Sequence, residues 1–248
     1  MDLELSGKVA LVTGGSKGIG RACAESLAAE GCRIGICARG AEALDTVARE
    51  LADRGATVIT ISADLSEEAS ASQVVTEVIR RFGQLDILVN NAGAIRDGGF
   101  LETAVSVWEH DWRLKLLGYI RMAQAALPFM RARRWGRIIN IVGTAARNPT
   151  TTFMAGGIAN AGLINFTRAL ADLGAPDHIL VTAVSPGPTT SEESDRDEVG
   201  RPVASPLGRM GRPRDVADLV TFLASERASF ITGVAITVDG GASRGVHL

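Results

Sequence analysis

The glycines between Thr13 and Gly20 have the types and spacing of a phosphate-binding turn. The stretch reads TGGSKGIG, directly after an apolar run and at the opening of a helical pattern. Gly14 permits the tight turn, and Gly18 and Gly20 let the backbone approach a pyrophosphate closely. The N-terminus of the following helix presents free N–H groups and the positive end of its dipole to that anion. The pattern therefore predicts a dinucleotide-binding site rather than a purely structural turn.

The end of the second apolar run indicates which dinucleotide is bound. An NAD site usually places an acid there to hold the ribose hydroxyls, but this run ends in Ala38 and Arg39. Glu42 follows only within the next helical turn, where an acid is ordinary. Arg39 and Lys17 could instead pair with a 2′-phosphate. The residues thus favour NADP(H) over NAD(H), the alternative being that Arg39 is a solvated strand end.

The elements that must position these residues follow from hydrophobic periodicity. Short apolar runs alternate with longer helical patterns, and the runs are continuous, as expected for strands buried on both faces of a parallel sheet. No composition break marks a second domain, so we predict an α/β, single-domain, Rossmann-type doubly wound fold over residues 1–248, with a parallel seven-stranded sheet. The predicted strands are 8–15, 33–39, 57–64, 85–93, 136–144, 179–187 and 233–241, and the predicted helices are 18–30, 41–54, 67–82, 103–132, 157–173 and 213–225.

Composition excludes several classes of partner. Hydrophobic residues make up 46% of the 248 residues and the formal net charge is −2, so no global field favours nucleic acid or anionic lipid. No segment approaches the roughly 18 apolar residues of a membrane span, and no secretion signal is recognised. Cys23, Cys32 and Cys37 form no CxxC pair, which favours buried free thiols in a reducing compartment. We expect a cytoplasmic protein with a small-molecule substrate, no nucleic-acid or membrane partner and no metal.

One long segment does not fit the core pattern. Residues 188–206 are charged, contain few apolar residues and follow the sixth predicted strand. A loop of this length in a compact domain is usually either disordered or functional. Because it leaves the carboxyl end of a strand, where ligands bind in such sheets, we favour a lid.

With these motifs in place, the chain resembles the short-chain dehydrogenase/reductase family over essentially its whole length. The motifs that carry the resemblance are TGGSKGIG at 13–20, ADL at 63–65, NNAG at 90–93, SPGP at 185–188 and FLASERASFITGVAITVDGG at 222–241. The resemblance implies Asp64 near the adenine ring, Asn90 and Gly93 along the cofactor path, and Pro186–Gly187 beside the nicotinamide. It also implies a homotetramer or homodimer. The candidate cofactor-binding residues are Gly14, Ser16, Lys17, Gly18, Ile19, Gly20, Arg39, Asp64, Leu65, Asn91, Ala92, Gly93, Asn160, Pro186 and Gly187.

The catalytic residues that the family implies are missing. The family transfers a hydride between a nicotinamide and a carbonyl or alcohol, using a Ser, a Tyr-x-x-x-Lys pair and an Asn. The corresponding positions here hold Gly143, Gly156, Asn160 and Lys115. No other alignment restores the pair, because Tyr119 is the single tyrosine and no lysine follows position 115.

Two of the four differences are an exchange, with Lys115 at the Asn position and Asn160 at the Lys position. We hypothesise that Lys115 supplies the missing positive charge to the cofactor ribose or to a substrate oxygen; the alternative is drift in a dead site. Thr144 is the best candidate for polarising the carbonyl. Three functions remain open: an NADP(H)-dependent oxidoreductase with a rebuilt site, a non-catalytic nucleotide-binding sensor or partner subunit, and a non-redox enzyme using Lys115 as a reactive amine.

Overall fold

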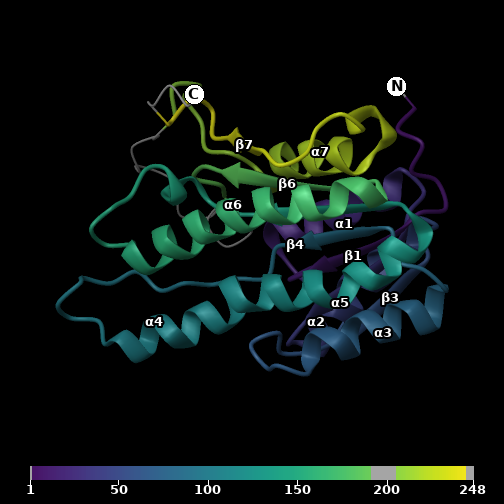
Figure 1. Ribbon diagram of the computed structural model, residues 1–248, viewed down its shortest axis with the longest axis horizontal. Coiled ribbons are helices and arrows are strands. Elements are labelled where there is room, and N and C mark those ends of the chain that lie inside the picture. Colours follow the sequence, from purple (N-terminus) through teal and green to yellow (C-terminus); the bar gives the residue numbers. More distant parts are fainter. Residues whose placement is uncertain (1, 191–204, 244–248) are drawn as a thin grey trace.

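The carboxyl ends of all the strands come to one edge of a single sheet. A computed structural model describes residues 2–190 and 205–243, and within them seven parallel strands are ordered β3-β2-β1-β4-β5-β6-β7 (Figure 1). The order reverses between β1 and β4, which is the point where doubly wound sheets bind ligands. The predicted fold class is confirmed. The strands are β1 (Val9–Thr13), β2 (Arg33–Ala38), β3 (Val58–Ser62), β4 (Ile87–Asn90), β5 (Gly136–Ile141), β6 (Ile179–Pro186) and β7 (Ala235–Val238).

Helices cover both faces of this sheet (Figure 1). One core cluster joins the inner faces of α1 (Gly18–Ala29), α2 (Ala41–Asp53) and α7 (Pro213–Ala224) to one face of the sheet. A second joins α3 (Ser70–Phe82), α5 (Gly118–Arg133) and α6 (Met154–Gly174) to the other. Burial on both faces explains why every residue of β1 and β5 is enclosed and why the strand sequences are continuously apolar.

The long predicted helix 103–132 is interrupted. It divides into α4 (Val105–Trp112), a π-helical turn η1 (Arg113–Leu117) and α5. Gly118 opens α5 with its backbone close to the loop after β3, since an added Cβ would lie 3.2 Å from the Leu65 carbonyl oxygen. π turns are rare and often occur at functional sites. Lys115 is the middle residue of this one.

Helix α6 begins earlier than predicted, at Met154 instead of 157, so Gly156 and Gly157 lie inside its first turn. The short 3₁₀ turn η2 (Thr144–Ala146) connects β5 to the loop before α6. Two further 3₁₀ turns, η3 (Ala175–Asp177) and η5 (Glu226–Ala228), lie at the opposite ends of α6 and α7 from the site. The turn η2 therefore brings the end of β5 beside the first turn of α6.

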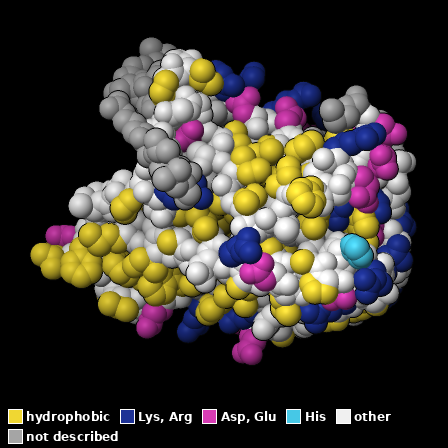
Figure 2. Space-filling model, turned by 45° about the horizontal axis from the view of Figure 1, so that its top comes forward, with side chains coloured by type: hydrophobic (Ala, Val, Ile, Leu, Met, Phe, Trp, Pro, Cys, Tyr) yellow, Lys and Arg dark blue, Asp and Glu magenta, His cyan; other side chains and the backbone are white. Residues whose placement is uncertain are grey.

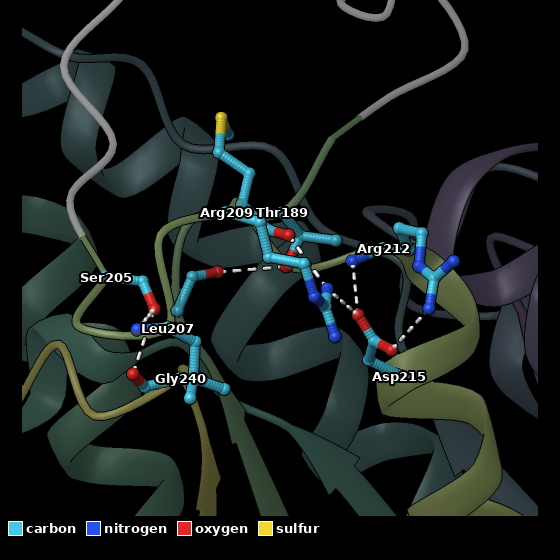
Figure 3. Close-up of polar contacts among 9 residues, drawn as sticks. Thr189, Ser205, Leu207, Arg209, Arg212, Asp215 and Gly240 are labelled. Carbon is cyan, nitrogen blue, oxygen red and sulfur yellow. Dashed lines mark hydrogen bonds and ion pairs between the residues drawn. The ribbon is translucent and has the colours of Figure 1, made fainter.

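The predicted lid falls mainly on residues 191–204, which lie outside the described residues. Its flanks are held together: Thr189 forms a β-bridge with Gly211, and the Ser205 hydroxyl donates to the Gly240 carbonyl (2.8 Å; Figure 3). Asp215, at the start of α7, accepts a hydrogen bond from the Arg212 amide (2.8 Å). This carboxylate also pairs with the Arg209 guanidinium, which holds the pKa of Asp215 down to about 2. These contacts fix both ends of the segment at the ligand-binding edge.

All three cysteines are buried and unpaired, as predicted. Burial raises the pKa of each thiol to about 12, so none is a nucleophile near neutral pH. Over residues 2–190 and 205–243, every helix is too short or too polar to span a bilayer. Nowhere in the same ranges do three or more His, Cys, Asp or Glu side chains converge on a possible metal site.

Candidate cofactor and active site

A cavity of about 510 Å³ opens at the point where the strand order reverses. Its walls are the glycine loop after β1, the ends of β2 and β3, the turn after β4, and the start of the segment after β6. The lining residues are Gly14, Ser16, Lys17, Gly18, Ile19, Cys37, Ala38, Arg39, Gly40, Ala63, Asp64, Leu65, Asn91, Ala92, Gly93, Ala94, Leu114, Thr189 and Thr190. The structure thus brings together most of the residues predicted to bind a cofactor.

The glycine loop is built for close backbone approach. Gly14 and Gly18 adopt positive φ angles of +67° and +55°, a conformation that other residues rarely adopt. At Gly20, inside α1, an added Cβ would collide with the Gly14 carbonyl and the Asn91 side chain. Gly20 therefore lies behind the loop and allows α1 to pack against it rather than lining the cavity.

The Thr13 hydroxyl couples this loop to the turn after β4. It donates to the Val89 carbonyl (3.3 Å) and accepts from the backbone amides of Asn91 (2.9 Å) and Ala92 (3.0 Å). The Asn91 carboxamide in turn donates to the Thr13 carbonyl (2.9 Å). Because Thr13 is only 1% exposed, these bonds are shielded from water and hold two cavity walls at a fixed spacing.

The prediction that Asn90 lies along the cofactor path is wrong. Its side chain is fully buried and donates to Asn140 Oδ1 (3.0 Å) and to the Tyr119 carbonyl (3.4 Å). Successive side chains of a strand point to opposite faces, so Asn90 enters the core while Asn91 turns to the glycine loop. Asn91, not Asn90, lines the cavity.

Charge in the cavity is distributed as the sequence predicts. Lys17 and Arg39 are exposed side chains on its wall, and Glu42 does not line it. The carboxylate that does line it is Asp64, at the end of β3. Hydrogen bonds from the Ser66 amide (2.9 Å) and hydroxyl (2.7 Å) lower the pKa of Asp64, which keeps it ionised. The tip of β2 thus presents cations and no acid.

Six predicted site residues lie outside this cavity: Gly20, Lys115, Thr144, Asn160, Pro186 and Gly187. Gly187 continues β6 by donating to the Val238 carbonyl (2.9 Å), and it packs against Asp239 with no room for a Cβ. Apart from Gly20, these residues belong to the ends of β5 and β6 and to the helices beside them. They form a second region at the same edge of the sheet.

Lys115 points inward from the π turn. Its side chain crosses the backbone of Gly93, where an added Cβ would collide with Lys115 Cδ. The ammonium donates to the Ile141 carbonyl at the end of β5 (2.7 Å) and to the Tyr119 hydroxyl (3.0 Å), and the Tyr119 hydroxyl also donates to that carbonyl (3.1 Å). Burial lowers the pKa of Lys115 to about 8 and raises that of Tyr119 well above its usual value. Of the two groups, only Lys115 can exchange a proton near neutral pH.

The space beside Gly156 is filled by an aromatic ring. A Cβ added to Gly156 would lie 2.6 Å from Phe153 Cδ1 and would overlap the ring atoms Cε1 and Cζ. Phe153 directly precedes α6, so the ring folds back over the first turn of its own helix. The volume into which a side chain at position 156 would project is therefore occupied by a group without a hydroxyl.

Gly143 and Asn160 face one another. A Cβ added to Gly143 would lie 3.0 Å from Asn160 Nδ2, and Asn160 is only 5% exposed. Its Oδ1 is enclosed and has no hydrogen-bond partner among residues 2–190 and 205–243. Thr144, next to Gly143, is half-buried and begins η2. At this end of β5, the carboxamide of Asn160 occupies the space that a side chain at position 143 would otherwise fill.

Two residues of this region were missed by sequence reasoning. Tyr119 was considered only with the residue four positions after it, whereas its partner Lys115 stands four positions before it. That spacing places two side chains on one helical face and was a usable signal. Phe153 had no such signal, because its position over Gly156 depends on where α6 begins.

Comparisons with known proteins agree with this architecture. A sequence model for the family described as enoyl-(acyl carrier protein) reductase matches residues 14–243. The chain is 39% identical over 246 residues to 3-oxoacyl-[acyl-carrier-protein] reductase of Aquifex aeolicus, covering 97% of this chain and 99% of that protein. It is 36% identical over 247 residues to the Escherichia coli protein of the same description, covering 96% and 98%.

Solved structures of reductases share this fold over nearly the whole chain. L-sorbose reductase from Gluconobacter frateurii, complexed with NADPH and L-sorbose, superposes with a TM-score of 0.93 at 33% identity, over 99% of this chain and 100% of that chain. YwfH, an NADPH-dependent reductase involved in bacilysin biosynthesis, gives a TM-score of 0.91 at 28% identity, over 97% and 100%. Sequence motifs, sheet order and these similarities agree over almost the whole chain. The chain belongs to the short-chain dehydrogenase/reductase family.

Proposed function

We propose that this protein is an NADP(H)-dependent oxidoreductase that interconverts a carbonyl and an alcohol on a small molecule. Its active site lacks the Ser, Tyr and Lys that the family implies and uses Lys115 in their place. The relatives named above are reductases, and two structural neighbours are described with NADPH. The observation that carries the proposal is the cavity at the strand reversal, with two cations and no acid at the tip of β2.

The described residues fit this cofactor. A Cβ on Gly18 would meet nothing within 4 Å, so the loop has free space there for a pyrophosphate. The Gly14 amide donates to the Cys37 carbonyl (2.7 Å), which fixes the start of the loop against the end of β2. Lys17 and Arg39 would hold the 2′-phosphate through charge-assisted hydrogen bonds. Asp64 and Leu65 would lie beside the adenine. When bound, NADPH supplies a hydride and is left as NADP⁺.

Lys115 would supply the proton of the reduction. An ammonium has three N–H donors, and two of them are used by Ile141 and Tyr119, so one remains for a substrate oxygen. With a pKa near 8, the group is mostly protonated at neutral pH yet gives up its proton at small cost. The bond to Ile141 keeps the charge at the end of β5 throughout, and solvent reprotonates the amine afterwards.

Binding of NADPH, followed by the rise in its fluorescence, tests the cofactor assignment. We expect Arg39→Ala to raise the Kd for NADPH about tenfold or more and to leave the Kd for NADH nearly unchanged, because only NADPH carries the 2′-phosphate. Arg49→Ala is the matched control, since Arg49 is an exposed arginine on α2 that does not line the cavity. Equal affinity for both cofactors in the wild-type protein would contradict the assignment.

A carbonyl panel of acetoacetyl-CoA, L-sorbose and cyclohexanone then tests the reaction, followed as loss of NADPH absorbance. Lys115→Met should lower kcat at least tenfold without changing NADPH binding. A second function, a non-catalytic NADP(H)-binding sensor or partner subunit, is favoured by one observation: the Phe153 ring fills the space above Gly156. Tight NADPH binding without turnover of a broad carbonyl panel would select this alternative.

We also propose that the protein assembles as a homotetramer or homodimer. Hydrophobic side chains gather at the α4 end of the molecule (Figure 2), where Phe100, Leu101 and Val105 are 60%, 89% and 65% exposed. An exposed apolar group of this kind is typical of an interface. Light scattering on the purified protein measures the assembly directly.

A further inference from the structure

We propose that the Asn160 carboxamide, which lies beside Gly143 at the end of β5, is the hydrogen-bond donor that orients and polarises the substrate carbonyl. This inference rests on the carbonyl chemistry proposed above. It gives Asn160 a direct contact with the substrate oxygen, in addition to the proton that Lys115 would supply.

The fit between Gly143 and Asn160 is the first observation. Asn160 contributes both atoms that an added Cβ at position 143 would meet within 4 Å: Nδ2 at 3.0 Å and Cγ at 3.8 Å. A separation of 3.0 Å is tighter than an ordinary carbon contact, so a larger residue at 143 would displace the amide. The glycine and the asparagine are thus matched, and the N–H groups of Asn160 are presented at the carboxyl end of β5.

The second observation is that the Asn160 side chain lacks a hydrogen-bond partner in the part of the chain that the structure describes. It is 95% buried, as 5% of its surface is exposed, yet within residues 2–190 and 205–243 no hydrogen bond joins its carboxamide to another residue. A buried polar group without a partner destabilises the fold, and almost all such groups in native proteins are bonded. Asn140, near the carboxyl end of β5, is a buried asparagine with partners on both sides of its amide, since it donates to Thr167 (2.9 Å) and accepts from Asn90.

Asn90 Oδ1 and Arg137 Nε are also enclosed without a partner among the described residues, but both of these side chains donate hydrogen bonds through other atoms, whereas the Asn160 carboxamide makes none there. Because Oδ1 can only accept, the group that would donate to a substrate oxygen is the unbonded Nδ2.

The third observation concerns the neighbouring donors. Reduction of a carbonyl places negative charge on its oxygen, which donors already in position stabilise best. The Lys115 ammonium is anchored to Ile141 and Tyr119, with one proton left to give. Thr144 is half-buried at the start of η2. Asn160, whose Nδ2 faces Gly143, is therefore the neutral donor that we assign to orientation at this end of β5, and Lys115 is assigned to proton transfer.

The test compares Asn160→Ala, Asn160→Asp and the double variant Gly143→Ser/Asn160→Ala, with Asn165→Ala, an exposed asparagine on α6, as the matched control. On whichever carbonyl of the panel the wild type reduces, we expect Asn160→Ala to lower kcat about 100-fold, as for loss of one donor to a developing oxyanion. Asn160→Asp should be at least as impaired, because it replaces a donor with a negative charge. The double variant should recover tenfold or more, since a serine hydroxyl returns a donor to the same space. The Kd for NADPH should stay within threefold of wild type throughout.

A stability measurement separates this role from a structural one and needs no activity. Asn160→Leu has a similar shape and removes the unpartnered amide, so the Tm of the cofactor-free protein should equal or exceed that of the wild type. A lower Tm, or a loss of NADPH affinity larger than the loss of kcat, would overturn the proposal and make Asn160 a structural or cofactor-ribose residue. If the wild type itself reduces no carbonyl, the proposed function fails; a raised Tm for Asn160→Leu would then still show that the amide is held at a cost to the fold.

Discussion

The position of the Phe153 ring over Gly156 leads to a prediction about stability. Replacing glycine by alanine inside a helix stabilises it by about 1 kcal/mol, because the unfolded chain loses freedom. Gly162 on α6 should gain this amount in full, since its added Cβ would meet only Leu116 Cδ1, at an ordinary 3.6 Å. At Gly156, the same methyl group would lie 2.6 Å from Phe153 Cδ1 and closer to the rest of the ring.

The ring must therefore rotate away, and overpacking of this kind costs about 1–3 kcal/mol. Gly156→Ala should consequently be neutral or destabilising by up to about 2 kcal/mol, whereas Gly162→Ala stabilises by about 1 kcal/mol. For a chain of this length, 1 kcal/mol corresponds to about 2–4 °C in Tm. The substitutions are otherwise the same, so the difference between them isolates the contact with the ring.

The assay is urea unfolding at a fixed protein concentration for Gly156→Ala, Gly162→Ala and both changes in a Phe153→Ala background. With the ring removed, Gly156→Ala should become stabilising, which gives a coupling free energy of about 1–3 kcal/mol between positions 153 and 156. The coupling between 153 and 162 should be close to zero. Equal stabilisation by the two alanines in the wild-type background would refute the placement of Phe153.

The site also leads to four shorter predictions. The low pKa of Lys115 means that, between about pH 8 and pH 10.5, the unfolded chain binds a proton that the folded chain lacks. Over that range the free energy of unfolding of the wild type should therefore rise with pH relative to that of Lys115→Met. Denaturation at several pH values measures this, and parallel curves for the two proteins would contradict it. In the same variant, the fall of kcat above about pH 8 should disappear. Thr13→Val should destabilise by about 1–3 kcal/mol, because the amides of Asn91 and Ala92 lose their buried acceptor, and should weaken NADPH binding. Gly20→Ala should weaken NADPH binding at least tenfold by pushing α1 from the glycine loop, whereas unchanged affinity would show that the loop can shift at little cost.

Local patterns predicted the sheet and the cofactor wall because both depend on nearby residues. Continuous apolar runs indicated buried strands. The glycine spacing after β1 identified the glycine loop, whose conformation is fixed within a few residues. The tip of β2 was equally readable, since Arg39 directly ends a strand. For the same reason, the absence of an acid there could be recognised without a structure.

The active region was harder to predict because it depends on which way successive side chains point along each element and on how neighbouring elements pack. Asn90 and Asn91 are adjacent and chemically identical, and only the alternation of side chains along β4 decides which one faces the cavity. The π turn at Lys115 breaks a helical period that appeared continuous in the sequence. The Phe153 ring covers Gly156 only because α6 begins three residues before the predicted start. Each of these depends on where neighbouring elements meet rather than on local composition.

The π turn also restricts how this chain can change in length. On the α4 side, Trp112 donates to the Ala155 carbonyl (2.9 Å) and Asp111 pairs with Arg96 (2.7 Å); on the α5 side, the Tyr119 side chain is locked into the core. A regular α-helix turns about 100° per residue, and a π turn holds one extra residue in roughly the same rotation, so removing one residue from 113–117 would restore regular winding and leave the two anchored ends nearly in their present orientation. A one-residue deletion there would thus be gentle on helix geometry and on both anchors but would displace the Lys115 ammonium. We therefore expect a one-residue deletion within this turn to preserve the fold and remove the Lys115 contacts, whereas a one-residue deletion within regular α4 or α5 would rotate the anchored ends against one another by about 100° and destabilise the fold.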